Sequence, residues 1–252
     1  MYMETVICIP FNNGALDHAG KFLVRAGITA APLSGADVTH LLLPVPSFDD
    51  AGKIRGGGSI EGILAQLPKD IRIIGGNLSH PALEGYRTLD LMQDKYYVNQ
   101  NAAITAYCAL KYIWNALPVT LSGQEILIIG WGRIGKCLAR LLRGLDARVT
   151  VYARKDTDRA LAQALGYTIT DELNDLSAFR VIVNTAPAAI VSEEAVQTCR
   201  RDCLKLDLAS ARGLPGNDVI HARGLPGKDA PESSGKLIAE RIISILNKED
   251  AL

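Results

Sequence analysis

The segment Glu125-Ile-Leu-Ile-Ile-Gly130-Trp-Gly132-Arg-Ile-Gly135 decides the fold class of this chain. Its apolar run predicts a buried strand, and the residues after its glycines predict an amphipathic helix over residues 134–143. Such glycines between a strand and a helix are typical of a dinucleotide-binding turn: Gly130 permits the tight turn, Gly132 lets the backbone approach a pyrophosphate, and Gly135 lets the helix pack closely. The free N–H groups and the dipole at the start of the helix then attract the phosphates. An ordinary glycine-containing turn is the alternative interpretation.

Short apolar runs alternate with amphipathic stretches along the chain, which is the pattern of a parallel sheet with crossing helices. The predicted fold class is α/β, a Rossmann-type doubly wound parallel sheet preceded by a smaller α/β (flavodoxin-like) domain. We expect strands at residues 5–9, 38–43, 71–74, 126–129, 148–152, 181–184, 204–208 and 219–222, and helices at 15–25, 59–66, 101–117, 134–143, 157–165 and 234–247.

This scheme divides the chain into two domains. We expect an N-terminal substrate-side domain at residues 1–100, a linking helix at 101–118 and a nucleotide-binding Rossmann domain at 119–252, with the final helix, 233–248, packing back on the first domain. The apolar residues of the linking helix, Tyr107 and Trp114 among them, follow a helical period. A near-repeat, Arg212-Gly-Leu-Pro-Gly-Asn-Asp and Arg223-Gly-Leu-Pro-Gly-Lys-Asp, predicts two similar turns.

Composition excludes several classes of partner. The 252 residues include 27 basic and 27 acidic side chains, so a net charge of zero gives no general attraction to nucleic acid or anionic lipid. No apolar run reaches the roughly 20 residues of a membrane helix, and the first residues do not fit a signal peptide. The five cysteines are an odd number and scattered, so we expect reduced thiols, no metal site and a cytoplasmic location.

The end of the next predicted strand selects between the two nicotinamide dinucleotides. NAD-binding sites place an Asp or Glu about 20 residues after the glycine turn, where it binds the ribose hydroxyls. Here the chain reads Val151-Tyr-Ala153-Arg154-Lys155, with no carboxylate before Asp156. Arg154 is suited to a charge-assisted, bidentate pair with a 2′-phosphate, and Lys155 adds a second positive charge. The sequence therefore predicts NADP; two solvated basic residues in an ordinary loop are the alternative.

Two further loops follow strands of the same predicted sheet, and ligands collect at the carboxyl ends of parallel strands. Asn184-Thr-Ala186 and Asp207-Leu-Ala-Ser210 offer short polar side chains there for the nicotinamide ribose, although such residues are also common in turns. The predicted cofactor-binding residues are Gly130, Trp131, Gly132, Arg133, Ile134, Gly135, Ala153, Arg154, Lys155, Asn184, Thr185, Ala186, Asp207 and Ser210.

A set of further motifs runs from about Val38 to the C-terminus. It comprises Leu42-Leu-Pro-Val-Pro46, the turn from Gly130 to Gly135, Ala153-Arg154, Val183-Asn-Thr-Ala-Pro187, Asp207-Leu-Ala-Ser210, and Gly224-Leu-Pro-Gly-Lys228 with Ala230-Pro231 and Ser234-Gly235. In these motifs the chain resembles the dipicolinate synthase family of endospore-forming bacteria, specifically its A subunits. It departs from that family at its first strand–helix turn, Pro10-Phe-Asn-Asn-Gly14, and at Ala211-Arg-Gly213, both near the expected substrate side.

The resemblance implies an NADP-dependent oxidoreductase that oxidises dihydrodipicolinate to dipicolinate in the mother cell during sporulation. The partner that it implies is a flavoprotein-like B subunit. The substrate ring becomes aromatic as it loses a hydride and a proton, so positioning supplies much of the catalysis, and no catalytic residue is assigned. We also expect a homo-oligomer.

A cyclic dicarboxylate needs fixed donors, such as Arg, Lys or the N–H groups that begin a helix. Ser233 and Ser234 are expected to begin the final helix. The predicted substrate-binding residues are Pro46, Ser47, Ser79, Leu225, Pro226, Gly227, Lys228 and Ser234.

Two other functions fit parts of the pattern. D-2-hydroxyacid dehydrogenases share the two-domain layout, and Arg212-Gly213 imitates their Arg-Gly step. However, Gly224-Leu-Pro-Gly stands where their catalytic histidine is expected, His221 lies too early, and the acid of an NAD site is absent. A non-catalytic NADP-binding protein is the second alternative, because a fold alone does not define an activity.

Overall fold

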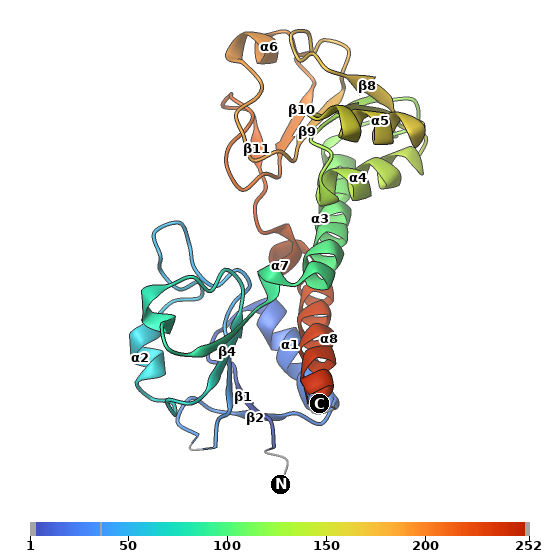
Figure 1. Ribbon diagram of the computed structural model, residues 1–252. Helices are drawn as coiled ribbons and strands as arrows, with labels where there is room; N and C mark the ends of the chain where they lie inside the picture. Colours follow the sequence, from blue (N-terminus) through green and yellow to red (C-terminus); the bar gives the residue numbers. More distant parts are fainter. Residues whose placement is uncertain (1–3, 36, 250–252) are drawn as a thin grey trace. The chain divides into compact units, whose positions relative to one another are not determined.

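A computed structural model of the chain describes residues 4–35 and 37–249 (Figure 1). These residues form two compact units. The terminal unit comprises the described residues up to Asn101 together with those from Pro226 to 249, and the central unit comprises Ala102–Leu225. The functional domain limits expected from the sequence stay a prediction, because compactness alone does not define a functional domain. No helix in the described residues is both long and apolar enough to cross a membrane.

The terminal unit is built on a parallel sheet with the strand order β2-β1-β3-β4-β5. This order is flavodoxin-like, with the switch point between β1 and β3, and it confirms the predicted class of the first domain. The central strands are buried on both faces, as is typical of parallel sheets. The strands are β1 (Val6–Cys8), β2 (Thr29–Ala31), β3 (His40–Leu42), β4 (Arg72–Gly75) and β5 (Arg87–Asp90).

Helices from opposite ends of the chain pack together in this unit. Figure 1 shows α1 (Gly14–Arg25) beside α8 (Pro231–Glu249), and a Cβ on Gly235 would collide with the carbonyl oxygen of Ala15. The expectation that α8 begins at residue 233 is wrong, because Pro231 occupies its first turn, where the missing N–H costs nothing. The remaining short helices of this unit are α2 (Ile60–Leu64), η1 (Pro81–Leu83) and η2 (Leu91–Gln93).

The central unit holds a parallel sheet with the strand order β11-β10-β9-β6-β7-β8. Counted from β6, this is the order 3-2-1-4-5-6 of a Rossmann sheet, so the predicted fold class is confirmed. The order reverses between β6 and β9, where such sheets bind ligands. The strands are β6 (Glu125–Ile129), β7 (Arg148–Tyr152), β8 (Thr168–Thr170), β9 (Val181–Asn184), β10 (Leu204–Asp207) and β11 (Ile220–His221).

The helices α4 (Arg133–Arg143), α5 (Asp156–Ala164) and α6 (Glu193–Gln197) lie in the central unit, and the long helix α3 (Lys95–Ala116) enters it. The near-repeat does not form two turns as expected. Residues 212–218 are irregular, with Gly216 at φ +121°, whereas Leu225–Asp229 form the short helix α7. Leu225 is buried and Pro226 occupies the first turn, which a helix tolerates.

Candidate functional site

The turn between β6 and α4 is closed by contacts that only glycine permits. Gly130 adopts φ +103°, and a Cβ there would lie 2.7 Å from the Thr185 hydroxyl. The Gly130 N–H donates to the Tyr152 carbonyl at 2.9 Å, while Thr185 Oγ1 donates to the Ile129 carbonyl at 3.1 Å. A Cβ on Gly135 would collide with the Gly130 carbonyl oxygen. Helix α4 therefore begins directly against the turn.

The start of α4 is open. Gly132 stands at the N-cap position with φ −80° and ψ −167°, and no side chain caps the helix or adds an acid to its first turn. A Cβ on Gly132 would meet nothing within 4 Å. Arg133 is exposed in the first turn, and Ile134 is half-buried. Unpaired N–H donors, a positive helix end and free space at one position fit the pyrophosphate of a dinucleotide.

The ring of Trp131 is buried, and it packs against other side chains of the central unit beside the glycine turn. The residue is 5% exposed, and its ring meets Tyr167 edge to face with centroids 5.2 Å apart. The guanidinium of Arg143 covers the Tyr167 ring at 4.4 Å. The indole Nε1 has no hydrogen-bond partner among the described residues. The side chain of Trp131 therefore supports the turn by packing.

The loop after β7 presents two exposed basic side chains, and the nearest carboxylate after the strand is engaged by an arginine of the following helix. Arg154 and Lys155 are exposed, while Ala153 is buried. Arg159 donates to the carbonyls of Ala153 and Arg154 at 2.8 and 3.0 Å and forms an ion pair with Asp156. The first carboxylate after the strand is thus held by Arg159, which sequence reasoning missed although the Asp156–Arg159 spacing is that of a helical pair.

The carboxyl ends of β9 and β10 are joined by buried polar side chains. Asn184 Nδ2 donates to Asp207 Oδ1 at 2.9 Å, and both residues are almost fully buried. Asn184 also donates to the Ala186 carbonyl and accepts from the Ala186 N–H, each at 3.1 Å. The side chains of Asn184 and Asp207 therefore bind each other and the backbone, and they fix the loop that carries Thr185 and Ala186.

Asp207 also organises the loop that follows β10. Its carboxylate accepts from the N–H groups of Ala209, Gly213 and Leu214 at 3.0, 2.8 and 3.1 Å. Ser210 and Arg212 stay exposed between these anchors. A Cβ on Gly213 would collide with Asn184 Nδ2, so the two loops touch. His221 Nδ1 lies 3.8 Å from Asp207 Oδ2. The register Asp207–His221 on paired strands produces this neighbour, which a single sequence window does not reveal.

The substrate candidates at the end of β3 are mainly structural. Ser47 is fully buried; its hydroxyl donates to the Pro44 carbonyl at 2.7 Å and accepts from the Gly76 N–H at 3.1 Å. Pro46, which precedes it, follows a cis peptide bond. Ser79 is exposed.

The candidates near the C-terminal helices differ in exposure. Leu225 and Pro226 are buried, whereas Gly227 and Lys228 are exposed. Ser234 is buried inside α8 and its N–H donates to the Ala230 carbonyl at 2.9 Å, so this N–H does not begin the helix as expected.

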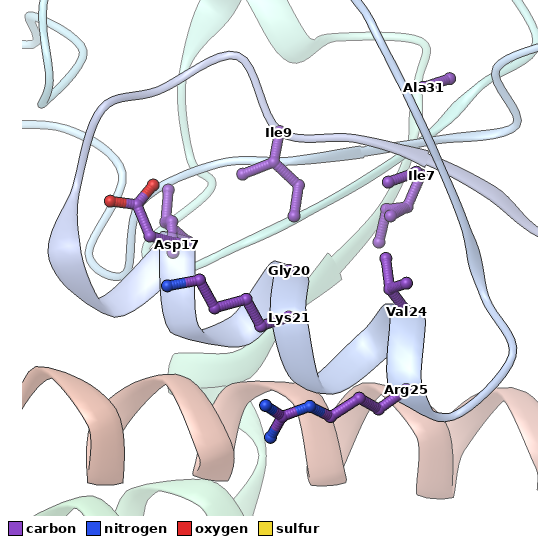
Figure 2. A pocket seen from close by; sticks show the side chains of 10 residues that line it. Ile7, Ile9, Asp17, Gly20, Lys21, Val24, Arg25 and Ala31 are labelled. Atoms are coloured by element: carbon purple, nitrogen blue, oxygen red, sulfur yellow. The ribbon is translucent and has the colours of Figure 1, made fainter.

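Each unit contains a cavity beside its parallel sheet. The larger, about 510 Å³, lies between α1 and the β1–β2 edge in the terminal unit, and Figure 2 shows Ile7, Val24 and Ala31 around it. None of the predicted site residues lines it. The smaller, about 260 Å³, lies in the central unit beside Tyr152 at the end of β7; its other lining residues are Asp171, Glu172, Leu173, Asn174, Ile190 and Ser192. The smaller cavity adjoins the carboxyl edge where the candidate cofactor residues gather.

Comparison with known proteins finds a family model that is similar to the central part of the chain. Residues 110–200 match the model of the D-isomer specific 2-hydroxyacid dehydrogenase, NAD binding domain. The A subunit of dipicolinate synthase from Bacillus subtilis (strain 168) is 26% identical over an alignment of 254 positions, gaps included, and the alignment covers 92% of this chain and 84% of that relative. This similarity confirms the resemblance that the motifs indicate.

Solved structures agree on the fold. The A subunit of dipicolinate synthase from Bacillus halodurans matches with a TM-score of 0.81 and 22% identity, over 98% of this chain and 99% of that one. The corresponding dipicolinate synthase structure from Bacillus subtilis matches with a TM-score of 0.82 and 20% identity, over 100% and 98%. Together with the family model, the curated relative supports an NAD(P)-dependent oxidoreductase that uses a nicotinamide cofactor.

Proposed function

We propose that this chain is an NADP-dependent oxidoreductase that resembles the A subunit of dipicolinate synthase and oxidises dihydrodipicolinate to dipicolinate. The observation that carries the proposal is a pair of helix starts without side-chain caps, α4 after Gly132 and α5 after Lys155. They follow β6 and β7, the first two strands of a Rossmann sheet, where the phosphates of a dinucleotide bind. The Bacillus subtilis relative supplies the substrate class.

The backbone from Gly130 to Gly135 would hold the pyrophosphate, and Arg154 with Lys155 the 2′-phosphate. The ion pair between Asp156 and Arg159 supports NADP over NAD, because the nearest carboxylate is already neutralised by a partner. The cavity of about 260 Å³ beside Tyr152 supports a place for the adenine at the same edge.

NADP, when bound, supplies the acceptor for a hydride from the substrate ring. The chain itself contributes positioning. Asp207 and Asn184 tie two loops together with buried hydrogen bonds, so that Thr185, Ala186 and Ser210 are held at the carboxyl edge. Because the product ring is aromatic, orientation of the reactants provides much of the rate without a strong base.

The substrate carboxylates need donors that are still free. Ser79, Gly227 and Lys228 are exposed and keep this role in the proposal. Pro46, Ser47, Leu225, Pro226 and Ser234 would act by shaping the surrounding backbone, since the hydroxyl of Ser47 and the N–H of Ser234 already have protein partners.

The proposed partners follow from the same relative. We propose that a B subunit completes the enzyme and that the chain works as a homo-oligomer in the cytoplasm of a sporulating mother cell. None of the five cysteines forms a disulfide in the described part of the chain, which fits a reducing compartment.

A D-2-hydroxyacid dehydrogenase activity is the second candidate, favoured by the family model over residues 110–200. Arg212 is exposed beside Gly213, and His221 lies near a buried carboxylate, as that chemistry requires. Against it stand the exposed basic residues Arg154 and Lys155, which do not suit NAD.

The deciding assay mixes the purified chain with NADP and enzymatically generated dihydrodipicolinate, in the presence and absence of a dipicolinate synthase B subunit. NADPH absorbance reports the reaction, and NADPH formation is the expected result. Oxidation of NADH by 2-oxo acids instead supports the second candidate. Cofactor binding without turnover of any of these substrates identifies a non-catalytic NADP-binding protein.

A further inference from the structure

In the terminal unit, buried polar contacts tie the loops that follow β3 and β4 to each other and to the sheet. Ser47, in the loop after β3, accepts from the Gly76 N–H at 3.1 Å. The carboxylate of Asp90 accepts from the N–H groups of Asn77 and Leu78, each at 3.0 Å, and holds the loop after β4. These loops lie at the carboxyl edge of a parallel sheet, where ligands bind. The side chains that the loops present there are therefore held in fixed positions.

The ring of His80, at the end of the loop after β4, is fixed by two contacts. It stacks on the ring of Phe48, with centroids 4.3 Å apart and 9° between the planes. Its Nδ1 accepts from the Ala82 N–H at 3.2 Å and caps the short helix η1. A ring nitrogen that accepts a hydrogen bond carries no proton, so this neutral imidazole holds its hydrogen on Nε2. The contacts thus define both the orientation of the ring and its donor atom.

The Nε2 atom of His80 remains available to a ligand. It has no hydrogen-bond partner in residues 4–35 and 37–249. Gly52 stands beside this edge of the ring, and a Cβ there would lie 3.8 Å from Nε2, so position 52 contributes no side chain that covers the atom. The residue is half-buried. A partly desolvated donor without a partner costs free energy, and a ligand that accepts from it recovers that cost.

The charges beside His80 favour an anionic ligand. Arg55 Nε donates to the Phe48 carbonyl at 3.0 Å, so a guanidinium is anchored on the same residue that stacks with the His80 ring. Two nearby acids already bind the protein. Asp49 accepts from two backbone N–H groups at 2.9 Å each, and Glu61 accepts at 2.6 Å from the serine hydroxyl that caps α2. An imidazole N–H with a guanidinium is a donor set that suits a carboxylate.

We propose that His80 Nε2 donates to a carboxylate of the ring dicarboxylate substrate, with Arg55 supplying positive charge. This inference rests on the proposed function and names a specificity-determining residue for it. His80 takes no part in the chemical step, because it binds the carboxylate equally in the substrate, the transition state and the product. Binding of this uniform kind lowers KM and leaves kcat unchanged.

Two substitutions separate the donor from the cap. His80→Asn keeps an acceptor for the Ala82 N–H, since Asn is a common N-cap residue, but it has no donor at the Nε2 position. His80→Gln brings an amide N–H toward the Nε2 position and loses the cap. Circular dichroism and thermal unfolding verify that both variants fold. We expect His80→Asn to unfold at the wild-type temperature and His80→Gln slightly below it.

Calorimetric titration of the full-length chain with dipicolinate measures the binding, in buffer freed of divalent cations and at saturating NADPH. We expect His80→Asn to weaken dipicolinate about tenfold or more, because a hydrogen bond to a charged group is lost. His80→Gln is expected to stay within about threefold of the wild type. The NADPH affinity is expected to be the same in all three proteins. In the NADPH assay, KM for dihydrodipicolinate follows the same order and kcat does not change.

The outcomes distinguish this inference from the proposed function. If dipicolinate affinity and KM are unchanged in His80→Asn, the role of His80 is wrong and the proposed reaction stands. Equal losses in His80→Asn and His80→Gln also overturn the role, because the Nε2 donor would then not be what binds. If the wild-type chain neither binds dipicolinate nor oxidises dihydrodipicolinate, the proposed function fails and this inference fails with it.

Discussion

The two units differ at the start of the helix that follows the first strand of each sheet. In each, a helix follows the first strand of a doubly wound parallel sheet. In the terminal unit, Asn13 accepts from the N–H groups of Ala15 and Leu16 at 3.0 and 3.3 Å and closes α1. In the central unit, Gly132 has no side chain with which to close α4. Both sheets belong to architectures that bind ligands. The residue at the helix start, rather than the fold, therefore distinguishes the capped start of α1 from the open start of α4.

The difference extends to α5 but not to α6, which Ser192 caps in the central unit. In the terminal unit, Ser59 caps α2, and Asp94 accepts from the Tyr97 N–H at 2.7 Å at the start of α3. In the central unit, α5 lacks a side-chain cap after Lys155. The starts of α4 and α5, which follow β6 and β7, therefore keep N–H donors without a side-chain cap. Three substitutions test this comparison, from the largest expected effect to the smallest.

Gly132→Asp converts the open start of α4 into a capped one. The backbone angles of Gly132 suit any residue and a Cβ there meets nothing within 4 Å, so the fold is expected to persist. The new carboxylate occupies the N–H donors and repels phosphate. We expect the NADPH dissociation constant to rise at least 100-fold in a fluorescence titration, with thermal stability unchanged or slightly higher.

The matched control is Asn13→Ala in the terminal unit. Loss of this cap is expected to reduce stability by about 1 kcal/mol without a change in NADPH affinity. If the wild type and Gly132→Asp bound NADPH with equal affinity, the open start of α4 would not be the feature that binds the cofactor.

Arg154→Asp tests the loop after β7. The substitution replaces a donor to the 2′-phosphate with an acid that suits the ribose hydroxyls of NAD. We expect NADP to weaken about 100-fold relative to NAD, about 2.7 kcal/mol. Calorimetric titration of both cofactors measures this ratio. A similar loss of affinity for NADP and NAD contradicts the assignment of Arg154.

Asp94→Asn tests a closed helix start through its pH dependence. Burial opposes the charged form, but the hydrogen bond from Arg241 at 2.5 Å and those from the α3 backbone outweigh it, so the pKa of Asp94 is held below its ordinary value of 3.8. Such a carboxylate stabilises the folded state above its ordinary pKa and loses this effect as the pH falls through its lowered value.

Asn retains the capping oxygen, so the substitution removes mainly the charge. We expect a loss of about 1 kcal/mol at neutral pH that disappears in strong acid, measured by denaturant unfolding. A loss that is the same at both pH values would show that the Asp94–Arg241 ion pair is not its cause.

The sequence predicted the central strands better than the edges of the sheets. Residues 148–152 and 181–184 were predicted with the bounds of β7 and β9, because buried parallel strands are continuous apolar runs. The missed strands β2, β5 and β8 are all at sheet edges and only three or four residues long, with no fully buried residue. Their formation depends on a neighbouring strand, which a local pattern does not contain.

The candidate site was likewise predicted only in part. Local spacing was sufficient for the turn from Gly130 to Gly135 and for the basic pair after β7. It did not reveal that Asn184 binds Asp207 across 23 residues of sequence, nor that Gly213 is pressed against Asn184. It also gave no sign that Trp114 lies on the exposed face of α3, because a helical period alone does not say which face is covered.

Isothermal titration calorimetry of the wild-type chain with NADP and with NAD tests the central claim most directly. The open start of α4 and the basic pair Arg154-Lys155 predict measurable heat for NADP, with a dissociation constant at least tenfold lower than for NAD. Folded protein that gives no heat with either dinucleotide contradicts the assignment of this turn as a cofactor site.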